Sequence, residues 1–270
     1  MRLAGYQPQF FPRLHYMNRI LASDIFEVSD YVQFVKKHAF PTADGSMKRG
    51  VSYQAHTPIK LGSGEFLLVI PAHEEMLAIN KTRIDYSQNW AEKMLKTIEV
   101  GYRKSRNFDK FFPEVSEILS KKYDNLSDLT LKTTLWSLVR TVTDEPVDVD
   151  KLDVTSAISI LGKSNNPFRL REIFLASESS VPSPEKGKTN EWIIELCKFA
   201  KADEYYYGGT SHSAYMDLEK IEASGIKTVL QEWKCLEYPQ QYMKVGFLPN
   251  LSAIDLLMNT DLETRQKILS

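Results

Sequence analysis

The sequence is poor in cysteine. Its 270 residues include two, Cys197 and Cys235, which provide neither a disulfide framework nor a set of zinc ligands. The five histidines are scattered along the chain without the spacing of a metal-binding motif. We therefore expect a protein of a reducing compartment that has no metal site.

The sequence also lacks an excess of charge of either sign and a long apolar run. Its 34 basic and 35 acidic residues give a formal net charge of −1, which does not indicate binding to nucleic acid. No apolar stretch approaches the roughly 20 residues that span a bilayer, and the first residues do not have the pattern of a signal peptide. These absences predict a cytoplasmic protein without a membrane span, and 43% hydrophobic residues are enough for a sizeable core.

The first part of the chain has the pattern of a strand–helix–strand unit. Residues 2–6 form a short apolar run, residues 14–22 place apolar side chains at helical spacing, and residues 24–34 are rich in β-branched and aromatic side chains. Such a unit joins parallel strands, so it predicts an α/β fold with a parallel sheet. The apolar run after Gly62 predicts another buried strand.

From Trp90 onward the apolar period becomes that of helices, and Ser127 is a candidate N-cap of one of them. We predict a mainly helical block over residues 89–188, with a mobile loop at 179–188. Residues 1–88 and 189–270 would together form the α/β core. A further helix is expected after Thr189 or Asn190.

Two turns at the ends of predicted strands have the composition of binding loops. The first, in QPQFFP, offers the amides of Gln7 and Gln9 beside the ring of Phe10. The second, in YYYGGTSHSAY, offers close backbone approach, hydroxyl groups and an imidazole, from Tyr207, Gly208, Gly209, Thr210, His212 and Tyr215. In a parallel sheet both turns would lie at the carboxyl edge, where ligands bind. The alternative for the first turn is that Phe10 and Phe11 belong to the core and the glutamines cap helix ends.

Three stretches resemble the WbqC-like family: YQPQFFPRLHYMNRILASDIFEVSDYVQFVK, ADEYYYGGTSHSAYM and YPQQYMKVGFLPNLSAIDLLMNT. The resemblance implies a transferase in surface-polysaccharide (O-antigen) or other specialised sugar or amino-acid biosynthesis. We interpret this as acyl or aminoacyl transfer to the amino group of a small amine or amino-sugar. The donor would be a nucleotide-linked or carrier-bound acyl group, and an acyl carrier protein is a candidate partner.

The sequence departs from the family pattern at three places. His15 stands where the family usually has glycine, and Met94 stands where a histidine is common. An Asn-Arg pair expected after the second strand is missing around SYQAHTPIK, so an arginine that would hold an anion is not found there. His15 and His56 are candidates to compensate for it.

The order of the first elements also resembles that of the HIGH-motif nucleotidyl transferases, which implies a Rossmann-like core with the HUP-like strand order. Arg13 and Tyr16 stand where the two histidines of that motif would fall, so the residues themselves do not support adenylyl transfer. An ATP- or nucleotide-dependent activating enzyme is therefore an alternative function. A non-catalytic binding partner in a biosynthetic complex is a second alternative.

Amine acylation needs a proton acceptor and polar groups that hold the substrate. Asp30 and His15 are the candidate catalytic residues, each with a structural role as the alternative. Other candidate substrate-binding residues are Gln33, Lys36, Tyr238 and Gln240.

Three further reactive side chains have mainly structural interpretations. Cys197 falls on the apolar face of a helix and is expected in the core. Cys235 follows Lys234, which would lower its thiol pKa and make it a minor candidate nucleophile. Asp255 shares the apolar side of the last predicted helix stripe, so we expect it to be buried against a backbone group or an arginine.

Overall fold

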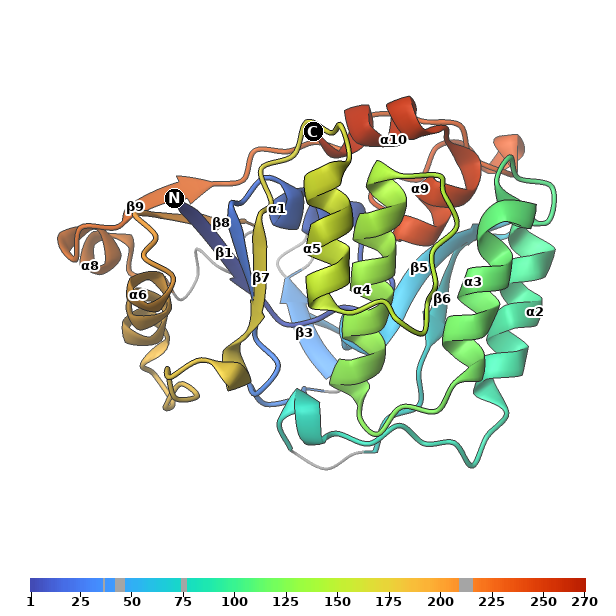
Figure 1. Ribbon diagram of the computed structural model, residues 1–270. Coiled ribbons are helices and arrows are strands. Elements are labelled where there is room, and N and C mark those ends of the chain that lie inside the picture. Colours follow the sequence, from blue (N-terminus) through green and yellow to red (C-terminus); the bar gives the residue numbers. More distant parts are fainter. Residues whose placement is uncertain (36, 42–46, 74–76, 209–215) are drawn as a thin grey trace.

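The computed structural model describes residues 1–35, 37–41, 47–73, 77–208 and 216–270, with the backbone alone at 37–41 and 47–51. A five-stranded parallel sheet in the order β7-β2-β1-β8-β9 lies in the left half of the molecule as seen in Figure 1. Its strands are β1 (Arg2–Tyr6), β2 (Ile25–Val28), β7 (Glu172–Leu175), β8 (Glu204–Tyr207) and β9 (Lys227–Leu230). Numbered along the chain, this order is 3-2-1-4-5. The predicted α/β fold with a Rossmann-like parallel sheet is confirmed.

Side chains on the two faces of the sheet belong to two separate hydrophobic clusters, because successive residues of a strand point to opposite faces. Ala4 and Phe26 belong to the larger cluster, whereas Leu3 and Ile25 belong to the smaller one. The smaller cluster is covered by α6 (Thr189–Phe199) and α8 (Leu218–Ala223), seen on the left of Figure 1.

The larger cluster packs against the other helices of the described part of the chain. Helix α1 follows β1, and a helical block in the middle of the chain supplies much of the rest, including the fully buried Trp136. These helices are α1 (Leu14–Leu21), α2 (Trp90–Tyr102), α3 (Phe108–Ser120), α4 (Leu126–Val142), α5 (Val154–Lys163), α9 (Ala253–Asn259) and α10 (Leu262–Leu269). The described residues also form three short 3-10 helices, η1 (Ile79–Lys81), η2 (Ala176–Glu178) and η3 (Met243–Val245).

Two helix starts differ from the predicted ones. The N-cap of α4 is Asn125, whose side chain accepts a hydrogen bond from the N–H of Asp128, so the predicted cap Ser127 lies inside the helix. Helix α6 follows Lys188 and has no side-chain cap hydrogen bond from the expected Thr189 or Asn190.

Two antiparallel hairpins lie between β2 and the helical block: β3 (Lys37–Pro41) with β4 (Met47–Val51), and β5 (His56–Leu61) with β6 (Gly64–Val69). The apolar run after Gly62 forms β6, but the prediction that it is buried is wrong. Phe66, Leu67 and Val69 are exposed, because within the described part of the chain β6 pairs with β5 rather than joining the parallel sheet.

Two other predicted ranges need correction or extension. The strand predicted over residues 24–34 ends at Val28, so Ser29–Phe34 lie beyond the carboxyl end of β2. Strand β7 lies within the range predicted as mainly helical and pairs with β2. The division of the chain into a core and a helical block, and the mobility of residues 179–188, remain predictions.

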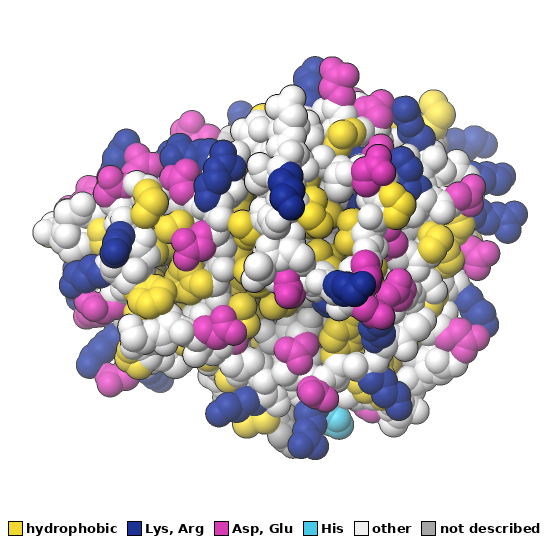
Figure 2. Space-filling view, viewed as in Figure 1, with side chains coloured by type: hydrophobic (Ala, Val, Ile, Leu, Met, Phe, Trp, Pro, Cys, Tyr) yellow, Lys and Arg dark blue, Asp and Glu magenta, His cyan; other side chains and the backbone are white. Residues whose placement is uncertain are grey.

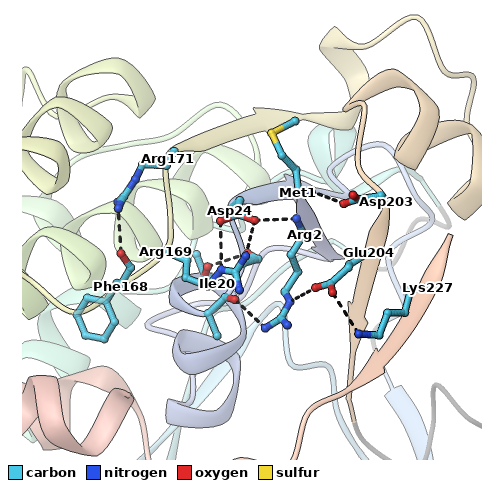
Figure 3. Close-up of polar contacts among 12 residues, drawn as sticks. Met1, Arg2, Ile20, Asp24, Phe168, Arg169, Arg171, Asp203, Glu204 and Lys227 are labelled. Carbon is cyan, nitrogen blue, oxygen red and sulfur yellow. Dashed lines mark hydrogen bonds and ion pairs between the residues drawn. The ribbon is translucent and has the colours of Figure 1, made fainter.

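Ion pairs join the strands at the amino edge of the sheet (Figure 3). Arg2 Nε donates to Glu204 at 2.9 Å, and Lys227 Nζ lies 3.4 Å from the same carboxylate. Arg169 donates twice to Asp24, at 3.1 and 2.8 Å, and the backbone N–H of Arg2 also reaches Asp24. Opposite charges at this edge therefore satisfy one another.

The surface seen in Figure 2 carries basic and acidic side chains interspersed, in keeping with the net charge of −1. Within the described residues, no helix is both long enough and apolar enough to cross a membrane.

Candidate functional site

The carboxyl edge of the sheet brings Gln7, in the first predicted turn, and Gly208, the last described residue of the second, to neighbouring strand ends. Strands β1 and β8 are parallel neighbours, with Arg2 opposite Glu204, so Gln7 and Gly208 both follow carboxyl ends of adjacent strands. The chain order reverses between these strands, which is where open α/β sheets bind ligands. Of the other predicted site residues, Lys36, Gly209, Thr210, His212 and Tyr215 lie outside the described residues.

The loop after β1 is fixed by the core behind it. Phe11 has a φ of 35°, a left-handed conformation that costs a bulky residue about 1–3 kcal/mol. Two threonine hydroxyls hold this turn: Thr133 Oγ1 accepts from the N–H of Phe11 at 3.1 Å, and Thr57 Oγ1 donates to its carbonyl at 2.6 Å. Phe10 and Phe11 are both fully buried, so the ring of Phe10 lies in the core rather than at the rim.

Polar groups without partners gather beside this loop. Gln54 Nε2 donates to Gln7 Oε1, whereas Gln54 Oε1 is buried with no partner among the described residues. Arg13 Nε is also buried with no partner among the described residues, and the Arg13 guanidinium lies 5.7 Å from the ring centroid of Tyr53. Gln9 is nearly buried and accepts from the N–H of Arg13 at 3.5 Å. Orphaned polar atoms of this kind need an explanation, and a ligand is one.

Arg19 of α1 is the main charged group at this edge. Its side chain is buried, its Nε and Nη2 donate to Gln231 Oε1 at 3.1 and 3.0 Å, and its guanidinium lies 5.4 Å from the ring centroid of Tyr6. A Cβ on Gly208 would stand 2.6 Å from Arg19 Nη2, so the end of β8 needs a glycine for this arginine to approach. Burial lowers the pKa of Arg19.

Neither Arg13 nor Arg19 forms an ion pair with a carboxylate within the described part of the chain, but the charge of Glu65 raises the pKa of Arg13 and partly offsets the effect of burial. A buried cation without an anion is costly, and guanidinium groups bind carboxylate and phosphate with well-defined geometry. Arg19, which is buried and has no carboxylate among the groups that shift its pKa, is therefore suited to bind an anionic group, and Arg13 is less buried. Both were missed as an anion site from sequence, although they stand six residues apart in the segment that follows the first strand.

His15 lies between these arginines in the sequence. Burial, with added repulsion from Arg19 and Arg13, lowers its pKa to about 4, so the imidazole is neutral at pH 7. Asn250 Oδ1 accepts from the N–H of His15 at 2.9 Å and lies 3.0 Å from its Nδ1. Because that oxygen cannot donate, Nδ1 carries the proton and Nε2 holds the lone pair. The catalytic role of His15 remains a prediction.

Asp30 is buried at the end of β2, and its carboxylate is fully engaged. It accepts from the N–H and Oγ of Ser177 at 2.9 and 2.5 Å and from Asn80 Nδ2 at 3.1 Å. These bonds tie the ends of β2 and β7 to η1. A role for Asp30 as a base remains a prediction, and this geometry favours a positioning role. Gln33 is exposed and forms a backbone bridge to Ala78.

Glu27, the third residue of β2, is a second group that the sequence reasoning missed. It is fully buried; Oε2 accepts from Ser29 Oγ at 2.8 Å, and Oε1 has no partner among the described residues. Gly5 leaves room for it, since a Cβ there would lie 2.4 Å from Oε2. Burial raises the pKa of Glu27 to about 8. The feature of the sequence that could have pointed to Glu27 is that it is the single acidic residue of the otherwise apolar strand IFEV.

Tyr238 and Gln240 belong to a polar cluster in the closing segment. Asp255 accepts from the hydroxyls of Tyr102 and Tyr238 at 2.7 and 2.8 Å, and Gln240 Oε1 accepts from Lys60 Nζ at 3.2 Å. The prediction that Asp255 bonds to a backbone group or an arginine is therefore wrong. Burial raises the pKa of Asp255 to about 6. The cluster joins α9 to β5 and α2, and none of these bonds reaches either turn.

The two cysteines have different environments. Cys197 is fully buried in the smaller cluster, as expected. Cys235 is half-buried, its Sγ accepts from the N–H of Asn250 at 3.2 Å, and burial raises its thiol pKa. This is opposite to the lowering expected from Lys234, so the structure gives no support for a nucleophilic thiol.

Within the described residues, no group of three or more His, Cys, Asp or Glu side chains is arranged to hold a metal ion. No curated protein and no solved structure matches the chain. The sequence profile of the WbqC-like protein family, in contrast, matches residues 7–141 and 160–267. These two ranges cover most of the chain and include both Gln7 and Gly208. The chain belongs to the WbqC-like protein family.

Proposed function

We propose that this protein is a biosynthetic transferase whose site lies at the carboxyl edge of the sheet, between β1 and β8. In this proposal the site binds a donor through an anionic group and transfers an acyl or aminoacyl group to an amino group. The acceptor would be a small amine or an amino-sugar. Membership of the WbqC-like family supports a role in biosynthesis, and the reaction itself is our inference.

The buried guanidinium of Arg19 carries this proposal. It lies at the reversal of strand order, beside Gly208, which follows β8, with no carboxylate partner in the described part of the chain. Arg13 is a separate guanidinium, at the N-cap of α1, whereas Arg19 lies in the last turn of that helix. Nucleotide-linked and carrier-bound donors both contain phosphate, so a buried arginine at this position suits either donor.

The reaction needs a group that accepts the proton of the amine. The imidazole of His15 is a weak proton acceptor, because its pKa is about 4. When the amine attacks the acyl carbon, its nitrogen loses a proton and the donor carrier leaves with the bonding electron pair. Glu27 has a pKa of about 8, which suits a proton acceptor near neutral pH better than an ordinary carboxylate. We therefore add Glu27 to Asp30 and His15 as groups to test.

A thermal-shift screen tests the proposal. The panel contains a nucleotide, a nucleotide-sugar and coenzyme A as a carrier-type donor, each with and without Mg²⁺. A ligand at 100 times its dissociation constant should add about 2.7 kcal/mol of stability. The Arg19→Gln variant should lose this stabilisation, and Arg13→Gln serves as a second variant if the first unfolds. Absence of stabilisation by every member of the panel would contradict the proposal.

The strand order supports one other function. The order 3-2-1-4-5 is the HUP-like order expected from the resemblance to nucleotidyl transferases, so a nucleotide-dependent activating enzyme is our second candidate. Stabilisation by ATP with Mg²⁺, together with substrate-dependent release of pyrophosphate, would favour it over acyl transfer. Ligand binding without any turnover would instead favour the non-catalytic partner.

A further inference from the structure

The start of α2 opens onto a hollow of about 520 Å³ that is separate from the carboxyl edge of the sheet. The hollow lies between the first turn of α2 and the end of α3. Its volume is in the range of small-molecule sites. Its lining combines apolar and aromatic side chains with polar and basic ones, and the residues used below are Tyr86, Trp90, Leu95, Leu119, Lys121 and Lys122.

The indole of Trp90 differs from the other three tryptophan indoles of the chain. Trp136 donates to Glu114 at 2.8 Å, Trp192 to Tyr31 Oη at 2.9 Å, and Trp233 to the carbonyl of Ile268 at 2.9 Å. The Trp90 side chain is 7% exposed, and its Nε1 is buried without a partner among the described residues. A buried donor without an acceptor is costly, so its presence beside a hollow calls for an acceptor.

The first turn of α2, a helix of 13 residues, presents further donors at the same place. Asn89 occupies the N-cap position but does not cap the helix, since its side-chain amide donates to the carboxylate of Glu92. The N–H groups of Ala91 and Glu92 have no acceptor within the described part of the chain. Free N–H groups and the helix dipole together favour an anion at such a terminus.

The named charges around the hollow balance, but one of the lysines is not paired. Lys122 forms no ion pair in the described residues, and its Nζ lies 5.9 Å from the ring centroid of Tyr86. Lys121 is neutralised by Glu117 and Asp150. Glu92 is the opposing charge, and Lys96 Nζ binds it at 2.8 Å. Lys122 is thus the cation left to face a ligand.

We infer that this hollow is a second binding site, for the phosphate or carboxylate group of a small, partly apolar ligand. The anionic group accepts from the Trp90 indole, from the N–H groups of Ala91 and Glu92 and from Lys122. The apolar part of the ligand lies against Tyr86, Leu95 and Leu119. This inference does not depend on the proposed function at the sheet edge.

Titration with inorganic phosphate and with phenyl phosphate, followed by ¹H–¹⁵N NMR on the full chain at constant ionic strength, tests the inference. The Trp90 indole signal, assigned with Trp90→Phe, should move along one saturable curve together with the amides of Ala91 and Glu92. The indoles of Trp192 and Trp233 serve as internal controls and should not move. Phenyl phosphate should bind at least about threefold more tightly than phosphate, because its ring meets the apolar lining.

Two further arms decide the chemistry. Lys122→Met should weaken phosphate binding by about threefold or more, whereas Lys163→Met, at the end of α5 and not part of the lining, should not. Benzoate in place of phenyl phosphate shows whether a carboxylate suffices. The inference is overturned if the Trp90 signal does not saturate with either probe, or if all four indoles shift in parallel.

Discussion

The two edges of the parallel sheet handle charge in opposite ways. At the amino edge, Arg2, Lys227 and Glu204 neutralise one another, and a hydrogen bond from Arg2 lowers the pKa of Glu204. At the carboxyl edge, Glu27 and Arg19 are buried, and neither has an oppositely charged partner in the described part of the chain. Charge that is paired contributes to the fold. An acid that burial keeps protonated and a guanidinium that is buried without an anion both lower stability at pH 7, so their retention points to a ligand.

The largest expected effect on stability is a gain from Glu27→Gln. The folded-state pKa of about 8 lies above the ordinary value of 4.5, so the favourable contribution of this acid is present below pH 4.5 and is lost as the pH rises through 8. An amide does not ionise, so the variant should be more stable than the wild type by about 3 kcal/mol at pH 7 and nearly equal at pH 4. Urea unfolding at both pH values measures this, and a loss of stability at pH 7 would refute the comparison.

A smaller loss is expected from Gly5→Ala. The new methyl group would stand 2.4 Å from Glu27 Oε2, and overpacking of this kind costs about 1–3 kcal/mol. In a Glu27→Ala background the contact is absent, so the cost of Gly5→Ala should fall by at least about 1 kcal/mol. A double-mutant cycle from unfolding curves gives this coupling. If Gly5→Ala destabilised the protein equally in the two backgrounds, the Glu27 side chain would not be what a Cβ on Gly5 collides with.

The smallest effect is expected at the amino edge. Glu204→Gln breaks pairs that are partly exposed, so it should destabilise the protein by less than about 1 kcal/mol at pH 7. Because the pKa of Glu204 is lowered, this contribution is lost as the pH falls, and the variant should match the wild type in acid. The same unfolding measurements therefore give opposite signs at the two edges. If Glu204→Gln stabilised the protein, the amino and carboxyl edges of the sheet would not differ in how they handle charge.

Local pattern was sufficient for much of the fold. Apolar spacing located β1 and α1, and the strand–helix–strand order implied the parallel sheet that brings Gln7 and Gly208 to one edge. Local pattern did not predict the features that depend on which strands pair, such as where a strand ends and whether it is buried. The β-branched and aromatic composition continues past Val28, but the register with β7 ends there. Strand β6 has the composition of a buried strand and lies in an exposed hairpin.

The candidate site was less accessible to prediction, because its charges are defined by what surrounds them. An arginine in a helix is ordinary in sequence; Arg19 becomes unusual only when Tyr6, Gly208 and Gln231, from three different strand ends, enclose it. Asp30 looked like a free carboxylate, and Ser177, 147 positions away, engages it. Such long-range partners cannot be read from residue spacing.

Calorimetric titration of the tightest ligand from the screen into wild type, Arg19→Gln and Arg169→Gln tests the central claim most directly. Arg169 is the matched control, an arginine paired with Asp24 at the amino edge. We predict that Arg19→Gln weakens binding at least about tenfold, the effect of losing about 1.4 kcal/mol, and that Arg169→Gln leaves the affinity unchanged. Equal affinity for all three proteins would contradict a carboxyl-edge anion site.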